Sequence, residues 1–171
     1  MGLMGTPPYV SALRRHIGND LLLLPGVSVI ILRESAQHGR QVLLVQRADT
    51  GAWTPITGIV DPDEEPHEAA IREAAEEASL TIHVTRVLAV GKTQRIRYPS
   101  GDECQFIETV FAATPTSDSP PARVGDEENL RVRWFPVTQL PEMQPRFVHA
   151  VRLACGDHPT QLGLSPASPG S

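Results

Sequence analysis

The segment Glu65–Ala78 constrains the fold of this chain most, because acidic and apolar residues separate onto two sides of one helix. Pro66 suits the first helical position, and the run of alanines that follows favours helical continuation. At about 100° per residue, Glu73, Glu76 and Glu77 fall within an arc of roughly 100°. Ala70, Ile71, Ala74 and Ala78 occupy a different arc. We therefore expect a helix that packs these apolar residues on a sheet and gathers three carboxylates on another face.

The three carboxylates have two possible interpretations. Glu73 and Glu77 are four residues apart, and like charges at this spacing destabilise an isolated helix by roughly a few tenths of a kcal/mol. A divalent cation such as Mg²⁺ would reverse this repulsion, because it prefers carboxylate oxygens, water and substrate phosphates as ligands. The alternative is a solvated acidic helix face with Arg72 as an ordinary surface partner. Periodicity alone does not decide between the two.

Extended segments surround this helix, and two further segments have helical spacing. The expected helices are Tyr9–Ile17 and Pro145–Cys155. The expected strands, named for their β-branched and apolar content, are Val27–Leu32, Gln41–Gln46, Trp53–Gly58, Thr81–Tyr98, Glu103–Ala113 and Leu130–Phe135. Thr114–Asp126 is rich in Pro, Ser and Thr, which predicts a mobile loop. Strands dominate without regular alternation with helices, so the expected class is α+β.

Length and charge limit the classes of protein further. The 171 residues suit a single domain, and the net charge of −5 disfavours DNA binding, which depends on Lys and Arg. Two cysteines, Cys104 and Cys155, are too few for a disulfide framework. The apolar runs are shorter than the roughly 18–20 residues that a membrane span needs, and the first residues lack the order of a signal peptide. We expect a cytoplasmic protein without membrane contact.

The spacing of residues around the acidic helix is more specific than its periodicity. Five residues separate Gly58 from Glu64, seven more lead to Arg72-Glu73, and Glu76-Glu77 follows after two alanines. This pattern resembles the Nudix box, and six specified positions match in register. The resemblance covers roughly residues 24–141. It implies residues 21–156 as a Nudix domain. The sequence outside it predicts an N-terminal segment with a short helix in residues 1–20 and a disordered tail in residues 157–171.

Three positions depart from the family pattern. Ser79 stands where the family usually has glycine, at the turn that leaves the helix, and a left-handed conformation would cost a non-glycine residue about 1–2 kcal/mol. Ala74 replaces a larger aliphatic residue. Ile56-Thr57-Gly58 replaces a Pro-Gly-Gly-like run. None of these changes removes a carboxylate, so we expect activity to survive.

The resemblance implies an α/β/α sandwich, with a mixed sheet between helices, and a site for Mg²⁺ with Mn²⁺ as substitute. Glu73 and Glu77 become the main candidates for metal ligands, and Glu76 is a ligand or positions a water. By the same resemblance Arg72 orients a glutamate and Glu64 fixes the loop within the box. The carbonyl of Thr57, just before Gly58, is a further candidate ligand.

Residues outside the box extend the candidate site. The acidic loop before Trp134 offers Glu128 as an extra ligand or base, with Glu127 next; a solvated acidic loop is the alternative. Arg47 ends a strand and would contact substrate phosphates, because a guanidinium suits bidentate phosphate binding; it is otherwise merely exposed. Arg97 and Tyr98 precede a hairpin turn that approaches the active site or a dimer partner in a related subgroup, or else forms a plain exposed tip.

The implied function is a metal-dependent Nudix pyrophosphohydrolase. Its expected substrate is a nucleoside diphosphate linked to another group, such as an ADP-ribose-like or CDP-alcohol-like molecule or a nucleoside triphosphate. No base-reading motif selects among these. The alternative is a Nudix-fold module that senses a nucleotide without cleaving it. A homodimer, in which the N-terminal helix packs on a second subunit, is a further expectation from the resemblance.

Overall fold

The structure, a computed structural model, describes residues 6–165. This part of the chain forms three helices and nine strands. In chain order the elements are α1 (Pro8–Ile17), β1 (Leu22–Ser35), β2 (Gly39–Arg47), β3 (Trp53–Thr54), β4 (Ile56–Ile59), α2 (Pro66–Ala78), β5 (Ile82–Lys92), β6 (Ile96–Arg97), β7 (Glu103–Pro115), β8 (Asn129–Pro136), α3 (Pro145–Cys155) and β9 (Gln161–Leu162).

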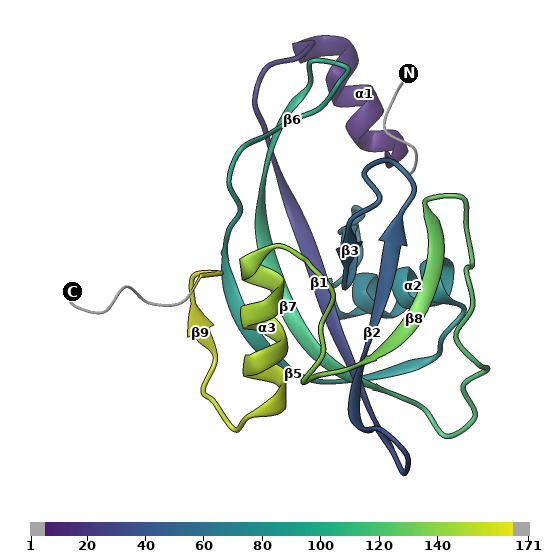
Figure 1. Cartoon of the computed structure of the whole chain (residues 1–171). Coiled ribbons are helices and arrows are strands. Elements are labelled where there is room, and N and C mark those ends of the chain that lie inside the picture. The colour runs from purple at the N-terminus through teal and green to yellow at the C-terminus, as the bar shows by residue number, and fades with distance from the viewer. Residues whose placement is uncertain (1–5, 166–171) are drawn as a thin grey trace.

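The long strand β1 organises a mixed sheet. Its first part runs parallel to β7, its middle part lies antiparallel to β4, and its last residues form an antiparallel hairpin with β2. The strand β8 adds to β2, and β5 adds to β7. Helices α2 and α3 lie on opposite sides of this sheet (Figure 1). The α+β class and the mixed sheet between helices are thus confirmed, and none of the helices in residues 6–165 is long and apolar enough to cross a membrane.

The alternation of side chains along β1 builds one hydrophobic core on each face of the sheet. Val27, Val29 and Ile31 face α2, whose alanines at positions 69, 70, 74 and 78 are fully buried against them. Ile30 faces the other way, into a second core to which α3 contributes Val151 and other apolar residues. The expected packing of this helix face on a sheet is therefore confirmed for Ala70, Ala74 and Ala78, but not for Ile71, whose side chain is exposed. The same packing fixes the rotation of α2 and hence the direction of its glutamates.

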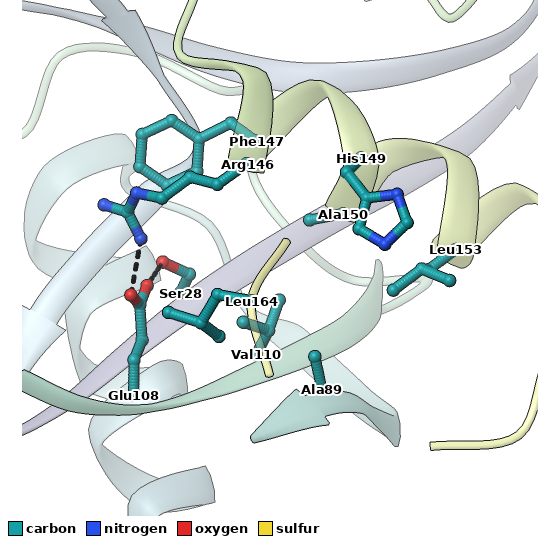
Figure 2. A pocket seen from close by; sticks show the side chains of 10 residues that line it. All are labelled: Ser28, Ala89, Glu108, Val110, Arg146, Phe147, His149, Ala150, Leu153 and Leu164. Atoms are coloured by element: carbon teal, nitrogen blue, oxygen red, sulfur yellow. Dashed lines mark hydrogen bonds and ion pairs between the residues drawn. The ribbon is translucent and has the colours of Figure 1, made fainter. Parts of the chain in front are cut away.

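A buried charged group ties α3 to the sheet. Glu108 on β7 is 4% exposed, and its carboxylate accepts hydrogen bonds from the Ser28 hydroxyl and from Arg146 Nη1 (Figure 2). The Arg146 guanidinium also lies 3.9 Å from the centre of the Phe147 ring. The space beside these residues measures about 10 Å³, which holds roughly one water molecule. The network thus closes the second core instead of opening a cavity.

Several boundaries differ from expectation. β1 extends through Pro25 and Gly26, because proline lacks only a donor and its carbonyl still accepts the Val60 N–H. The expected strand Thr81–Tyr98 divides into β5 and β6. Residues 157–165 of the expected disordered tail are placed: β9 pairs with β5, and Leu164 is buried in the second core. The rest of that expected tail, residues 166–171, lies outside the described residues.

The helix α1 packs on its own chain. The Tyr9 hydroxyl donates to the Val60 carbonyl, and Val10 is buried beside Leu24 and Cys104. Arg14 donates to the carbonyl of Glu103, so it joins α1 to the start of β7. These contacts hold α1 against the end of the sheet that lies nearest the Nudix-like box. The expected packing of this helix on a second subunit stays a prediction.

The end of α2 has the left-handed residue that the sequence indicated. Ser79 has φ 55° and ψ 30°, and its N–H donates to the Ala75 carbonyl. The next N–H, from Leu80, donates to the Ala74 carbonyl. This turn reverses the chain into β5 but holds a side chain in a region that favours glycine.

We predict that Ser79→Gly stabilises the protein by about 1 kcal/mol or less. Glycine relieves the left-handed strain but adds chain entropy to the unfolded state, and the two effects partly cancel. Urea denaturation measures the difference in free energy of unfolding. A clear decrease would show that the Ser79 side chain stabilises the turn by more than the strain costs.

Candidate active site

Arg72 on α2 connects the residues of the box. Its Nε and Nη2 donate to the two carboxylate oxygens of Glu64, at 2.8 and 2.9 Å. Nη1 donates to Glu73 and Glu76, at 2.8 and 3.2 Å, and Nη2 also donates to the Ile59 carbonyl. The Glu64 hydrogen bonds are the main cause of a raised pKa of Arg72. The guanidinium thus fixes the loop before the helix and the first two carboxylates at once.

Gly58 allows Glu73 to lie against the strand β4. A Cβ atom at position 58 would come within 2.2 Å of the carboxylate carbon of Glu73. The backbone of Gly58 is not left-handed, because Gly58 is not one of the described glycines with a positive φ. The glycine is required here by the close approach of a side chain. The first glycine of the box therefore sets the position of the first helix carboxylate.

Glu77 is the most deeply buried of the helix carboxylates. It is 6% exposed, and its Oε2 accepts a hydrogen bond of 2.8 Å from the side-chain amide of Asn129, the first residue of β8. Asn129 is itself buried and lies opposite Arg47 in the pairing of β8 with β2. Asn129 was not among the sequence candidates, because no local pattern indicates which strand residue meets the helix. It joins the acidic helix to the strand that carries Arg47.

The loop before β8 is fastened to the carbonyl end of α2. The N–H of Arg123 donates to the Ala78 carbonyl, and the N–H of Gly125 donates to the Glu77 carbonyl. A Cβ atom at Gly125 would lie 1.9 Å from the Glu76 carbonyl oxygen, so only glycine fits this contact. The end of the expected mobile loop Thr114–Asp126 is thereby docked against the helix. The docking brings the following acidic residues toward the box.

Two of these acidic residues act on the helix carboxylates. Asp126 Oδ1 accepts a hydrogen bond from the Glu128 N–H, and the Glu128 carbonyl accepts one from the Ala48 N–H. The charges of both acids contribute to the pKa of Glu77. Glu128 is half-buried, whereas Glu127 between them is exposed. The structure thus separates the two loop candidates: Glu128 turns toward the site and Glu127 toward solvent.

Burial raises the pKa of three carboxylates in this region. Desolvation is the main cause for Glu73, whose pKa rises to about 7, and for Glu77, whose pKa rises to about 8. For Glu73 the hydrogen bond and charge of Arg72 oppose the rise. The pKa of Glu128 is raised too, first by burial and then by the charge of Asp126. The protein alone therefore does not balance the negative charge of this cluster.

The donor set suits a hard divalent cation, since it offers several half-buried or buried carboxylates with unbalanced charge. The carboxylates do not yet converge, however. Among residues 6–165, no three His, Cys, Asp or Glu side chains lie close enough together to hold a metal ion. Glu73 and Glu76 are turned toward Arg72, and Glu77 is turned toward Asn129. The carboxylates are therefore suitable ligands for a metal ion, but their hydrogen bonds to Arg72 and Asn129 keep them apart in this structure.

Arg47 lies beside this cluster and is bound to an acid of its own. Its Nε and Nη2 donate to the two carboxylate oxygens of Asp49, at 2.9 and 2.7 Å, and this pair raises the pKa of Arg47 and lowers that of Asp49. The charges of Glu77 and Glu128 also act on Arg47. Sequence reasoning missed Asp49, although a carboxylate two residues from an arginine is a signal that local spacing offers.

The two candidates from the hairpin, Arg97 and Tyr98, lie in different surroundings. Tyr98 is half-buried against the core that α1 covers, and burial, as the main cause, raises its pKa. The charges of Arg47 and Asp49 act on Tyr98 as well, which places its ring near that pair. Arg97 is exposed, and its guanidinium lies 3.9 Å from Glu103. Tyr98 therefore approaches the candidate site, whereas Arg97 faces its neighbour across the hairpin.

The remaining candidates lie in and around the loop of the box. Thr57 pairs with Ser28 and precedes Gly58 in β4, so its carbonyl stays a candidate ligand. Asp61, which the sequence did not single out, lies 4.0 Å from Arg72, and its N–H donates to Glu64. These contacts agree with a role for Glu64 in fixing the loop.

The whole arrangement matches a known family. The NUDIX domain family model covers residues 22–153, so the chain belongs to the Nudix family. It is 30% identical over 141 residues to the human 8-oxo-dGDP phosphatase NUDT18, a match that covers 80% of this chain but 38% of the human protein. It is 40% identical over 116 residues to a putative 8-oxo-dGTP diphosphatase of Bacillus subtilis (strain 168), covering 68% of each chain.

A solved structure shows the same fold. The ADP-ribose pyrophosphatase of Streptococcus suis 89-1591 superposes with a TM-score of 0.60 at 18% sequence identity, covering 82% of this chain and 97% of that chain. The two relatives and this structure are named as a phosphatase, a diphosphatase and a pyrophosphatase. The chain thus has the Nudix fold and a complete set of box glutamates.

We predict that Gly58→Ala lowers turnover at least tenfold with little change in melting temperature. The new methyl group would displace the Glu73 carboxylate, which is the flexible end of a side chain and rotates away at small cost to the fold. Steady-state kinetics and thermal denaturation measure the two effects. Full activity would show that the position of Glu73 against β4 is not needed for catalysis.

Gly125→Ala is the matched variant, and for it we predict that the main effect is a loss of stability rather than a direct loss of turnover. Its methyl group would meet a backbone carbonyl, which cannot move without shifting the loop or the end of α2. We expect a loss of roughly 1–3 kcal/mol in the free energy of unfolding, the range for overpacking a tight contact. An unchanged melting temperature would show that the loop is not docked on α2 in solution.

Proposed function

We propose that this protein is a metal-dependent Nudix hydrolase that cleaves a phosphoric anhydride bond of a nucleotide. The observation that carries the proposal is the pair Glu73 and Glu77 on α2, a half-buried and a buried carboxylate whose charge Arg72 and Asn129 leave unbalanced. A module that only senses a nucleotide has no need of two such carboxylates. Their cost in burial is explained by a cation that they bind.

Glu73, Glu76 and Glu77 would hold Mg²⁺, with Mn²⁺ as substitute, and Glu128 and the Thr57 carbonyl would complete the set. When bound, the cation neutralises charge on the phosphates and lowers the pKa of a water ligand. Arg72 would retain Glu64 through its Nε and Nη2, so the loop would stay fixed if its Nη1 released Glu73 and Glu76. The hydrogen bonds of Arg72 would thus divide into those to Glu64, which persist, and those to Glu73 and Glu76, which exchange for the cation.

Glu128 is our candidate for the general base. Burial raises its pKa, which makes its carboxylate a stronger proton acceptor, and its carbonyl bond to the Ala48 N–H holds the loop beside the strand β2. Arg47 would contact the substrate phosphates after exchanging Asp49 for them, since a guanidinium binds either kind of anion bidentately. Tyr98 would border the same site, and Arg97 is a candidate only for a substrate group that reaches the hairpin.

For the substrate we propose a purine nucleoside di- or triphosphate with an oxidised guanine. The two curated relatives carry names of this kind, one for the diphosphate and one for the triphosphate. ADP-ribose, the substrate named for the Streptococcus suis structure, is the second class to test, because that likeness is of fold alone. A cytoplasmic location and a homodimer stay predictions.

A substrate panel tests this proposal. We expect Mg²⁺-dependent release of phosphate or pyrophosphate from 8-oxo-dGDP or 8-oxo-dGTP to exceed that from unmodified nucleotides and from ADP-ribose. Glu73→Gln and Glu77→Gln should each lower kcat by about two orders of magnitude or more, because each removes a charged ligand. Glu142→Gln, outside the box, is the control. Turnover near that of the unchanged protein in both box variants would disprove the metal site.

A second pair of variants tests the loop acid. We predict that Glu128→Gln lowers kcat at least tenfold, with a smaller change in KM and no loss of thermal stability, because its half-buried carboxylate lies toward the site. Glu127→Gln should do much less, since that side chain is exposed. If the two variants exchange their effects, the base is Glu127. If neither lowers kcat, the loop acids belong only to the surface.

A further inference from the structure

The first residues of β8 leave the regular pairing with β2. Gln46 of β2 lies opposite Arg131. The next residue of β2, Arg47, lies opposite Asn129, so Leu130 between them has no partner across the ladder. The Leu130 side chain is 59% exposed. An extra residue of this kind is a β-bulge, which changes the face of the sheet to which a neighbouring side chain points.

The bulge at Leu130 turns Asn129 toward the acidic helix. Side chains two residues apart in a regular strand point to the same face of a sheet. Val132 packs in the core that α2 covers, so Arg131 points to the other face, and a regular strand would send Asn129 there too. Instead the Asn129 amide donates to Glu77 Oε2 on α2, the helix that passes behind β2 in Figure 1. The bulge thus brings a buried donor to a carboxylate of the box.

The two oxygens of the Glu77 carboxylate have different surroundings. Oε2 accepts the 2.8 Å hydrogen bond from Asn129, whose side chain is itself buried. Oε1 accepts no hydrogen bond from the described residues. The buried side-chain oxygen that lacks a partner in this part of the chain is Thr54 Oγ1, and Glu77 Oε1 is not such an atom, so it keeps contact with solvent. Glu77 is therefore held through one oxygen and open through the other.

The other two helix carboxylates are held by a cation instead. Glu73 and Glu76 both accept a hydrogen bond from Arg72 Nη1, at 2.8 and 3.2 Å. To bind a metal ion they would have to leave the guanidinium. Glu77 would not have to leave Asn129, because its second oxygen is open. Asn129 is also neutral, so it orients Glu77 without cancelling the charge that attracts a metal ion.

We propose that Asn129 is a positioning residue for metal binding, an inference that rests on the proposed function. Its amide keeps Glu77 Oε2 bonded with or without metal and leaves Oε1 for the cation. Hydrogen bonds to ligating carboxylates are a usual part of metal sites, and loss of such an outer partner costs about 10–100-fold in metal affinity or activity. Glu77 is thus the fixed carboxylate of the site, and Glu73 and Glu76 are the ones that move.

The first test follows the Asn129 amide in the unchanged chain. Asn19 and Asn129 are the two asparagines of the sequence, so ¹⁵N-asparagine labelling gives two side-chain amide groups in an NMR spectrum. Asn19 is exposed and serves as the internal reference. We expect the Asn129 amide protons to exchange with solvent at least tenfold more slowly than those of Asn19, both in EDTA and in saturating Mg²⁺. Loss of this protection in Mg²⁺ would overturn the proposal, because Glu77 would then have left Asn129.

The second test measures metal affinity by titration with Mn²⁺. Asn129→Leu nearly keeps the shape of the side chain but removes the donor, and we expect the Kd for Mn²⁺ to rise at least tenfold. Leu130→Ala is the matched control, since it changes the exposed neighbour in the bulge and should leave the Kd within about twofold. Melting temperatures are recorded for both variants. A lower melting temperature with an unchanged Kd in Asn129→Leu would overturn the proposal, because a structural role alone predicts that result.

A double variant shows whether Asn129 acts through Glu77. In a chain that already carries Glu77→Gln, we expect Asn129→Leu to change the remaining Mn²⁺ affinity by less than about twofold, because residues that act through one contact are not additive. A further tenfold loss would overturn the proposal, since Asn129 would then act on another part of the site. The NMR test needs no variant, so it decides the matter even where Asn129→Leu does not fold.

The outcomes also separate this proposal from the proposed function. An unchanged chain that binds neither Mn²⁺ nor Mg²⁺ and hydrolyses no nucleotide would disprove the proposed function and the role of Asn129 with it. An unchanged chain that requires metal for turnover, but whose Kd for Mn²⁺ is the same in Asn129→Leu, would overturn the role of Asn129 alone.

Discussion

The hydrogen bonds of Arg72 are the interaction on which the rest of the site depends. A single guanidinium holds the carboxylate of Glu64 in the loop, the carbonyl of Ile59 at the end of β4, and two glutamates of its own helix. Loop, strand and helix come from successive parts of the chain, so the sequence places them near one another at no large cost in loop closure. Exchanging Arg72 for lysine would remove the planar fork that makes these contacts simultaneous.

Close backbone approach is the second constraint. Gly58 lets the Glu73 side chain lie on β4, and Gly125 lets a distant loop rest on the last carbonyls of α2. The two glycines act in different ways, since one makes room for a side chain and the other for a backbone oxygen. Together they bring carboxylates from two separate segments to one end of α2. The acids of the loop then raise the pKa of the buried helix glutamates further.

Much of the fold and part of the site followed from the sequence. The helix with its alanine face, its start at Pro66 and the left-handed Ser79 were all predictable, because each depends on local chemistry. Asn129 was not, since its bond to Glu77 depends on how β8 pairs with β2. The order of the tail near Leu164 was missed for a similar reason. Its composition indicates a flexible end, but a free edge of β5 and an apolar gap beside α3 are properties of the assembled sheet.

The charges at the box control how a nucleotide can approach it. At the box, Arg72 is shared among three glutamates and Arg47 is bound to Asp49, so neither has a charge to spare for the buried Glu77. A nucleotide polyphosphate would be repelled from such a cluster unless a cation arrived with it or before it. Divalent metal is therefore the condition on which phosphate binding at the box depends.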